Sequence, residues 1–133
     1  MARLGTERAW VVHGADGLDE ITAGDKTFVA EATEGNVRTF ELAPEDFGVQ
    51  PVSMSGLAGS GAEENALTVG GVLSGERRDA ARTLVLMNAA AALHVGGAAD
   101  DLKDGMRLAE QSIDDGRAIE KLNELARMTT LTE

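Results

Sequence analysis

Short apolar runs separated by glycine and polar residues dominate the first half of the chain. Residues 9–12 are continuously apolar, which is typical of a strand buried on both faces. Residues 26–33 alternate in polarity, and residues 37–42 resume the pattern after Glu34, Gly35 and Asn36. Two such runs joined by a short connection that contains glycine predict a β-hairpin. Pro44 and the turn-forming residues around it end the second run.

Helical spacing replaces this pattern in the second half. Ser60 or Gly61 is suited to cap a helix over residues 62–73, because the glutamates at positions 63 and 64 then lie at the helix end that favours negative charge. Residues 79–95 are apolar on nearly every side, which predicts a buried helix.

Two further helices complete the pattern. Asp100 or Asp101 is expected to cap the third helix, whose apolar positions recur at helical spacing as far as Ile113. Gly116 separates it from a last amphipathic helix, with Ile119, Leu122 and Leu125 on one face. We therefore predict an α/β fold with one buried strand, a hairpin and about four helices. At 133 residues the chain is expected to be a single unit, with the strands in residues 1–58 and the helices in residues 59–133.

Charge and composition narrow the possible functions. The net charge is −11, from 23 acidic and 12 basic residues, which argues against a nucleic-acid surface and suits a site for a hard cation. The most apolar segment, residues 84–99, is interrupted by Asn88 and His94 and is shorter than the roughly 20 residues of a membrane span. There is no cysteine, and the N-terminus lacks the apolar core of a secretory signal. We expect a cytoplasmic protein.

Two glycine-containing stretches are candidates for binding loops. Residues 56–61 have the terminal glycines of a P-loop, but Ala62 and Glu63 stand where Lys and Ser or Thr are required, so a turn into a helix is the better interpretation. Residues 11–20 read VVHGADGLDE. This stretch is not a calcium loop, because Leu18 occupies the position of an oxygen ligand.

The second stretch suits a strand followed by a bent loop. Active sites of open α/β sheets lie beyond the carboxyl ends of strands, where Asp19 and Glu20 would project. Two carboxylates are suitable ligands for Mg²⁺, but the spacing alone also fits a solvated acidic turn. His13 and His94 have no nucleophile or second histidine at the spacing of a triad or metal site, which favours structural roles.

Four stretches together resemble a known family. They occur in the order VVHGADGLDEI, VRTFELAPEDFGV, EENALTVGGVLSGERRDAARTLVLMNAAAALHVGG and LKDGMRLAEQSIDDGRAIEKL. In this order they resemble the C-terminal part of the large α/β domain of the anthranilate phosphoribosyltransferase family, over residues 3–125. The resemblance implies the nucleoside phosphorylase/phosphoribosyltransferase type of α/β domain, of which this chain would be a part.

The resemblance also implies a reaction and a cofactor. The family transfers a phosphoribosyl group from phosphoribosyl pyrophosphate to anthranilate in tryptophan biosynthesis. The adjacent Asp and Glu of its corresponding loop bind a magnesium ion, which here implies Asp19 and Glu20 as ligands and Mg²⁺ as the cofactor. No catalytic residue is identified in this region, and the substrate-binding residues remain open.

Several family motifs do not occur in these 133 residues. They are a Gly-Thr-Gly-Gly-Asp loop, a Lys-His-Gly-Asn segment, an anthranilate-binding arginine and an N-terminal helical domain through which the family dimerises. The isolated chain is therefore expected to be inactive, and to bind phosphoribosyl pyrophosphate and anthranilate only with the missing part. Self-association or a complementary chain is expected. The alternatives are a part of a pyrimidine nucleoside phosphorylase-like protein and a non-catalytic, self-associating acidic module.

Overall fold

The computed structural model describes residues 5–57, 59 and 61–130. Three strands form one antiparallel sheet in the order β1 (Arg8–Gly14), β2 (Thr27–Thr33) and β3 (Asn36–Leu42). A short 3₁₀ helix, η2 (Pro44–Phe47), follows the sheet. The helices are α1 (Ala62–Leu73), α2 (Ala80–Val95), α3 (Leu102–Asp114) and α4 (Arg117–Thr130). The four predicted helices are thus present, with Gly61, Asp79 and Asp101 as the N-cap residues of the first three, while Ser60 lies outside the described residues.

The predicted hairpin is present as β2 and β3, with a tighter connection than expected. Thr33 pairs with Asn36, so the loop contains only two residues and Asn36 belongs to β3. Glu34 and Gly35 both have positive φ angles, of 51° and 80°. Positive φ at both loop residues is the geometry whose twist matches that of the flanking strands, and it explains the glycine.

The expectation that the first strand is buried on both faces is wrong in this structure. β1 pairs antiparallel with β2 from Arg8 opposite Thr33 to Gly14 opposite Thr27. Alternate side chains therefore point to opposite faces. Trp10 and Val12 pack against the core, whereas Val11 on the other face is 59% exposed. A continuous apolar run does not distinguish these cases, because both faces of β1 carry apolar residues.

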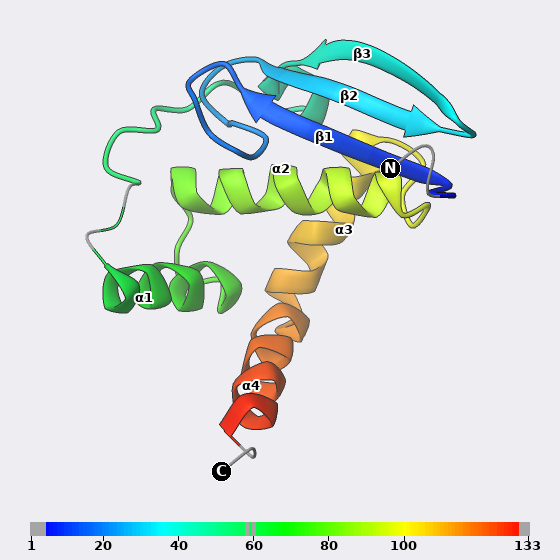
Figure 1. The fold of residues 1–133 in the computed structure, drawn as a ribbon. Helices are drawn as coiled ribbons and strands as arrows, with labels where there is room; N and C mark the ends of the chain where they lie inside the picture. The colour runs from blue at the N-terminus through cyan, green and yellow to red at the C-terminus, as the bar shows by residue number, and fades with distance from the viewer. Residues whose placement is uncertain (1–4, 58, 60, 131–133) are drawn as a thin grey trace.

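The buried helix predicted over residues 79–95 is α2, and it lies beneath one face of the sheet (Figure 1). Met87 and Ala90 are fully buried in the core between sheet and helices. α3 packs against α2 at Gly105, where an added Cβ would lie 2.6 Å from the carbonyl oxygen of Ala90. Glycine is therefore required at this crossing.

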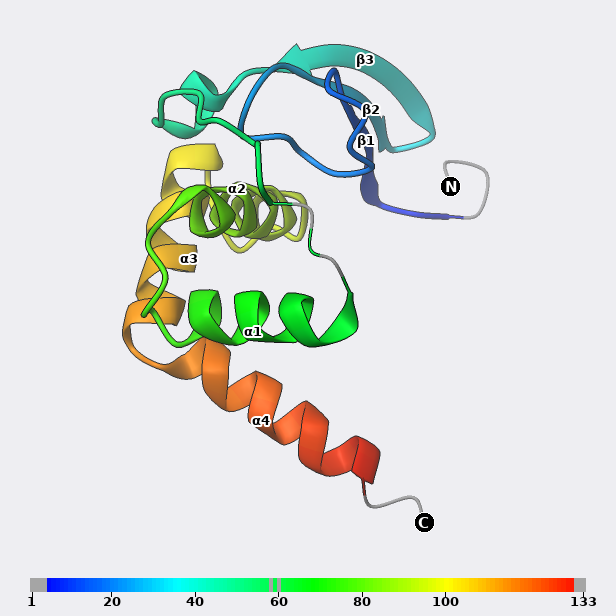
Figure 2. The same ribbon diagram turned by 90° about the vertical axis from the view of Figure 1, so that its left-hand side faces the viewer.

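The outer helices are less well covered. Figure 2 shows α1 below α2, with α4 projecting away from the sheet at the opposite end of the molecule. α4 is amphipathic as predicted, but within residues 117–130 no side chain is fully buried, and Leu125 and Met128 are about 60% exposed (59% and 61%). None of the helices within the described residues is long and apolar enough to cross a membrane.

Candidate functional site

The loop that carries Asp19 and Glu20 leaves the carboxyl end of β1 and returns to the start of β2. Its first part is a tight turn in which Gly14 N–H donates to the Leu18 carbonyl at 2.9 Å. Gly17 N–H donates to the Gly14 carbonyl at 3.0 Å, and Gly17 has a φ angle of 95° that favours glycine. This part of the loop is therefore held by its own backbone, and the second glycine is needed for its shape.

The second part of the loop is anchored from inside. Thr22 is fully buried, and its hydroxyl donates to Asp16 Oδ2 at 2.5 Å, which ties the two parts of the loop together. Thr22 N–H donates in turn to Thr27 Oγ1 at 3.1 Å, at the start of β2. Asp16 is thus a structural member of the loop, and Asp19 and Glu20 lie between its two anchored parts.

The Asp19 and Glu20 carboxylates have no protein partner within the described residues. Neither forms a hydrogen bond or an ion pair with any residue in the described part of the chain. Asp19 is exposed, while Glu20 is half-buried. Burial, and then the neighbouring charge of Asp19, raise the pKa of Glu20 above its usual value. A cation bound between the two carboxylates would relieve both effects.

In each of the other adjacent acidic pairs within the described residues, at least one carboxylate has a partner. Asp101 accepts a hydrogen bond from Asp104 N–H at 2.8 Å as the N-cap of α3. Asp114 pairs with Arg82 at 2.8 Å, and its neighbour at position 115 pairs with Arg117 at 3.3 Å. Adjacency of two carboxylates is therefore not by itself a sign of a site. The pair in the loop differs because neither of its two carboxylates has a partner within the described residues.

The ligand set fits a magnesium ion that also takes oxygens from a substrate. Within the described residues, no three histidine, cysteine, aspartate or glutamate side chains come together as a metal cluster. Mg²⁺ is commonly held by one or two carboxylates together with substrate phosphates, which is the number of ligands that Asp19 and Glu20 supply.

Sequence reasoning missed Asn88 as part of this region. Its Oδ1 accepts from Ile21 N–H at 3.0 Å, and its Nδ2 donates to the Ile21 carbonyl at 2.8 Å. Asn88 lies on α2, so these bonds join the loop to the central helix. The available signal was the lone polar side chain inside the apolar run of residues 84–93, since an amide placed among apolar side chains requires partners.

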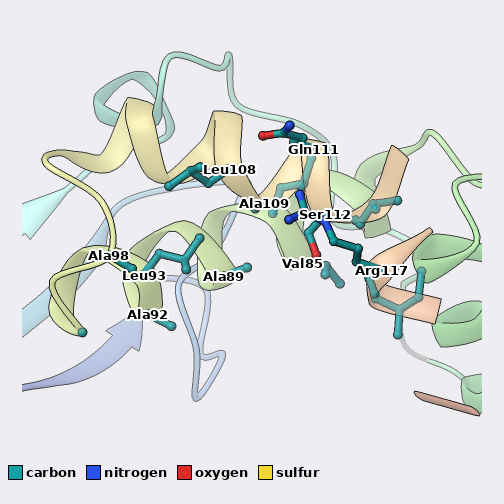
Figure 3. Close-up of a pocket in the computed structure, with 15 residues that line it drawn as sticks. Val85, Ala89, Ala92, Leu93, Ala98, Leu108, Ala109, Gln111, Ser112 and Arg117 are labelled. Atoms are coloured by element: carbon teal, nitrogen blue, oxygen red, sulfur yellow. The ribbon is translucent and has the colours of Figure 1, made fainter. Parts of the chain in front are cut away.

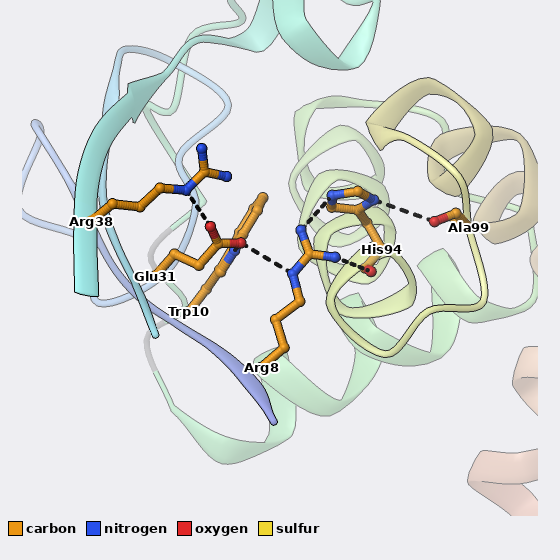
Figure 4. A network of polar contacts seen from close by, with 6 residues as sticks. All are labelled: Arg8, Trp10, Glu31, Arg38, His94 and Ala99. Atoms are coloured by element: carbon orange, nitrogen blue, oxygen red, sulfur yellow. Dashed lines mark hydrogen bonds and ion pairs between the residues drawn. The ribbon is translucent and has the colours of Figure 1, made fainter. Parts of the chain in front are cut away.

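The two histidines lie apart from the loop's carboxylates. His13 is exposed on the outer face of β1, opposite Phe28. His94, near the end of α2, joins a polar network under the sheet whose centre is Glu31 (Figure 4). The Glu31 carboxylate accepts from Trp10 Nε1 at 2.8 Å, from Arg8 Nε at 3.0 Å and from Arg38.

The network around Glu31 is saturated, which indicates a structural role. Glu31 is only 4% exposed, and hydrogen bonds from Trp10 and then Arg38 lower its pKa to about 2. Both carboxylate oxygens therefore remain ionised and bonded at neutral pH. No free acid or base is available here for chemistry.

An apolar cavity of about 790 Å³ lies between α2 and α3 and extends towards α4. Figure 3 shows Leu93, Ala89 and Val85 of α2 along it, with Leu108 and Ala109 of α3 opposite and Arg117 of α4 at one end. The cavity lacks a pair of titratable groups, so its chemistry suits packing and not catalysis.

The glycines of residues 56–61 do not form a phosphate cradle in the part that is described. Gly56 has a φ angle of 80°, and the Asn65 side chain fills the space next to Gly59, while residues 58 and 60 lie outside the described residues. The interpretation as a turn into α1 agrees with Gly61 as the N-cap of that helix.

Comparison with known proteins supports the resemblance drawn from the sequence. A sequence model described as glycosyl transferase family, a/b domain, matches residues 1–119. The chain is 54% identical over 126 residues to the anthranilate phosphoribosyltransferase of Myxococcus xanthus, covering 94% of this chain and 37% of that protein. It is 50% identical over 125 residues to the enzyme of Rhodopseudomonas palustris strain BisB18, again covering 94% and 37%.

Solved structures agree in fold. The anthranilate phosphoribosyltransferase of Thermus thermophilus superposes with a TM-score of 0.80 and 34% identity, covering 92% of this chain and 35% of that one. The yeast enzyme in complex with PRPP and Mg gives a TM-score of 0.77 and 32% identity, covering 86% and 33%. The chain thus spans a little over a third of the length of the curated relatives it matches, about 37% of the first of them.

Proposed function

We propose that this chain, which belongs to the glycosyl transferase family, a/b domain, forms part of an anthranilate phosphoribosyltransferase. In this proposal, Asp19 and Glu20 hold a magnesium ion that contacts the pyrophosphate of phosphoribosyl pyrophosphate. The sequence identities of 54% to the Myxococcus xanthus enzyme and 50% to the Rhodopseudomonas palustris enzyme support this assignment. A yeast relative of the same fold binds both PRPP and Mg.

The proposed reaction joins anthranilate to ribose. The amine nitrogen of anthranilate forms a bond to C1 of the ribose, the bond from C1 to the pyrophosphate oxygen breaks, and the amine loses a proton. A bound magnesium ion would supply charge neutralisation for the departing pyrophosphate. Phosphoribosyl anthranilate and pyrophosphate are the products.

The contribution of this chain is the placement of two negative charges. Asp19 and Glu20 lie at the carboxyl end of a strand, between two anchored parts of one loop. Neither carboxylate has a protein partner within the described residues, so both remain available to a cation, and this observation carries the proposal. The remaining substrate contacts are assigned to a complementary part of the enzyme.

A chimeric enzyme tests this function directly. The chain replaces the corresponding region of the Myxococcus xanthus enzyme, and phosphoribosyl anthranilate formation is measured over a magnesium titration. We expect activity that depends on Mg²⁺ and that falls on the order of 10²–10³-fold in Asp19→Asn/Glu20→Gln, by analogy with the loss of one oxyanion-hole donor. The isolated chain should show none, because both substrates must be positioned together.

The matched control removes two negative charges elsewhere. Glu110 and Glu120 are exposed on α3 and α4, and Glu110→Gln/Glu120→Gln should leave the rate unchanged. Equal rates and equal magnesium dependence in the loop variant and the wild-type chimera would mean that the pair is a solvated turn. Phosphorolysis of a pyrimidine nucleoside without anthranilate transfer would instead identify the phosphorylase alternative.

A further inference from the structure

We propose that Asn88 is a positioning residue for the metal-binding pair, because it fixes the peptide plane that follows Glu20. This inference rests on the proposed function of Asp19 and Glu20. Asn88 does not itself reach the metal in this proposal. It acts through the backbone of Ile21, to which it is bonded twice.

Asn88 forms hydrogen bonds with both the backbone N–H and the backbone carbonyl of Ile21. Oδ1 accepts from Ile21 N–H at 3.0 Å, and Nδ2 donates to the Ile21 carbonyl at 2.8 Å and to the Leu84 carbonyl one helical turn earlier at 3.0 Å. The Leu84 bond locks the amide against rotation. Ile21 is 2% exposed, so its N–H has little access to water as a substitute partner.

The peptide geometry connects these bonds to Glu20. The Ile21 N–H belongs to the planar peptide unit that begins at the Glu20 Cα atom. A hydrogen bond from this N–H to Asn88 therefore sets the direction in which the backbone leaves Glu20. The backbone that follows Glu20 is thus held by a residue of α2 that lies 67 positions after Ile21.

The opposite end of the pair is held in the same way. Gly14 N–H donates to the Leu18 carbonyl at 2.9 Å, and this carbonyl belongs to the peptide unit that ends at Asp19. Only the backbone dihedrals of Asp19 and Glu20 lie between these two held peptide planes. The backbone on both sides of the pair is thus held although the two charges repel each other, and such preorganisation is what a site for a divalent cation requires.

The sequence context argues against a merely incidental asparagine. Asparagine is a poor helix former, and residues 84–93 are otherwise apolar. A polar group in such a helix is unfavourable unless it is bonded. All three bonds of its amide are made, and two of them go to the loop.

The test compares variants of Asn88 by two measurements on the chimeric enzyme described above, with phosphoribosyl pyrophosphate present so that the phosphate oxygens of the site are supplied. Asn88→Leu keeps the approximate size of the side chain and removes its three hydrogen bonds. Asn88→Ala removes the same bonds but leaves space for water, so it serves as a second variant if Asn88→Leu does not fold. Manganese affinity is measured from the loss of the free Mn²⁺ electron paramagnetic resonance signal. Hydrogen–deuterium exchange of the peptide covering residues 15–26 is followed by mass spectrometry, with and without Mg²⁺.

We expect wild-type exchange in residues 15–26 to slow in Mg²⁺, and Asp19→Asn/Glu20→Gln to abolish this slowing. Both Asn88 variants should show faster exchange without metal and should bind Mn²⁺ about tenfold more weakly, a change of about 1.4 kcal/mol. Leu86→Ala removes core packing from the same helix, and Asn123→Ala changes an exposed asparagine of α4. Both controls should keep the wild-type manganese affinity at a temperature where they are folded.

The outcomes separate this inference from the proposed function. If wild-type exchange does not respond to Mg²⁺ at residues 15–26, the metal site itself is wrong, and the positioning role falls with it. If the wild type responds and the Asn88 variants bind Mn²⁺ no more weakly than Leu86→Ala, only the positioning role is overturned. Asn88 would then be a structural residue of the fold.

Discussion

Arg8 at the start of β1 is bonded to His94, which lies 86 residues later near the end of α2. The Arg8 guanidinium donates to the His94 carbonyl at 3.2 Å and to His94 Nε2 at 2.8 Å. Since a guanidinium can only donate, Nε2 is the acceptor, and Nδ1 carries the proton that faces the Ala99 carbonyl at 3.3 Å. Through Arg8, the edge of the sheet is fastened to the helix beneath it.

Glu31 should make the protein sensitive to acid. Its pKa is lowered to about 2 in the folded state, so its ionised form stabilises the fold above the pKa of the unfolded chain, about 4.3. This stability, on the order of 3 kcal/mol, should be lost as the pH falls from about 4.5 towards 2. Urea unfolding at several pH values measures it.

The variant Glu31→Gln tests the origin of that slope. It should lower the free energy of unfolding at pH 7, because Trp10, Arg8 and Arg38 lose the charged acceptor to which they donate. It should also flatten the pH dependence between about 4.5 and 2. A variant with the same slope as the wild type would show that other carboxylates cause it. Glu41→Gln, in an exposed pair with Lys26, is the control and should change little.

The hairpin loop offers two substitutions with opposite effects. Glu34 has a φ angle of 51°, a conformation that asparagine tolerates better than glutamate, so Glu34→Asn should stabilise the chain by about 0.5–1 kcal/mol. Gly35 has a φ angle of 80°, and Gly35→Ala should destabilise by a similar or larger amount. Thermal unfolding of both variants is the measurement. Shifts of the same sign would contradict the loop geometry.

The outer face of the sheet should promote association. Val11, Phe28 and Val37 lie on this face and are 59%, 48% and 64% exposed. Val11→Thr/Phe28→Thr keeps strand propensity but removes apolar surface, so binding of a hydrophobic dye and the mass measured by light scattering should both fall. Thr39→Val on the same face is the opposite change and should increase both. A wild-type chain that is a monodisperse monomer and binds no dye would rule this out.

As the pH is lowered, metal binding at the loop should begin to weaken at a higher pH than it would if Glu20 had the pKa of an exposed glutamate. The pKa of Glu20 is raised by burial and by Asp19, so protons compete for this carboxylate before they compete for an exposed one. We expect Mn²⁺ affinity to decrease as the pH is lowered, and the decrease should begin at a higher pH than at a site with an exposed glutamate. The profile is measured by paramagnetic resonance. An affinity that stays constant as the pH is lowered through the usual titration range of glutamate would disagree with Glu20 as a ligand.

The same pair should contribute nothing to folding stability. Asp19 and Glu20 have no hydrogen bond or ion pair with the described residues, and they repel each other. Asp19→Asn/Glu20→Gln should therefore unfold at a temperature equal to or higher than that of the wild type. A clearly lower melting temperature would indicate a structural role that the loop geometry does not show.

Local patterns in the sequence were sufficient to predict most of the elements. The cap Asp101, the stop at Gly116 and the alternation of the hairpin strands are local signals, since each depends on backbone groups a few residues away. The acidic pair was also visible in the sequence. Its assignment to magnesium came from the family resemblance, because spacing alone did not separate a metal site from an acidic turn.

Contacts between distant residues were decided only by the tertiary structure. The exposure of Val11, the pairing of β1 with β2, and the closeness of Gly105 to Ala90 depend on which surfaces meet. The same holds for Asn88, whose partner Ile21 is 67 residues away. The order of residues determined that a polar amide stands inside an apolar helix and therefore needs partners. Only the packing of the loop onto α2 determined that those partners are the backbone groups of Ile21, next to Glu20. The reason is that hydrogen bonds across the fold depend on distance in space and not on distance along the chain.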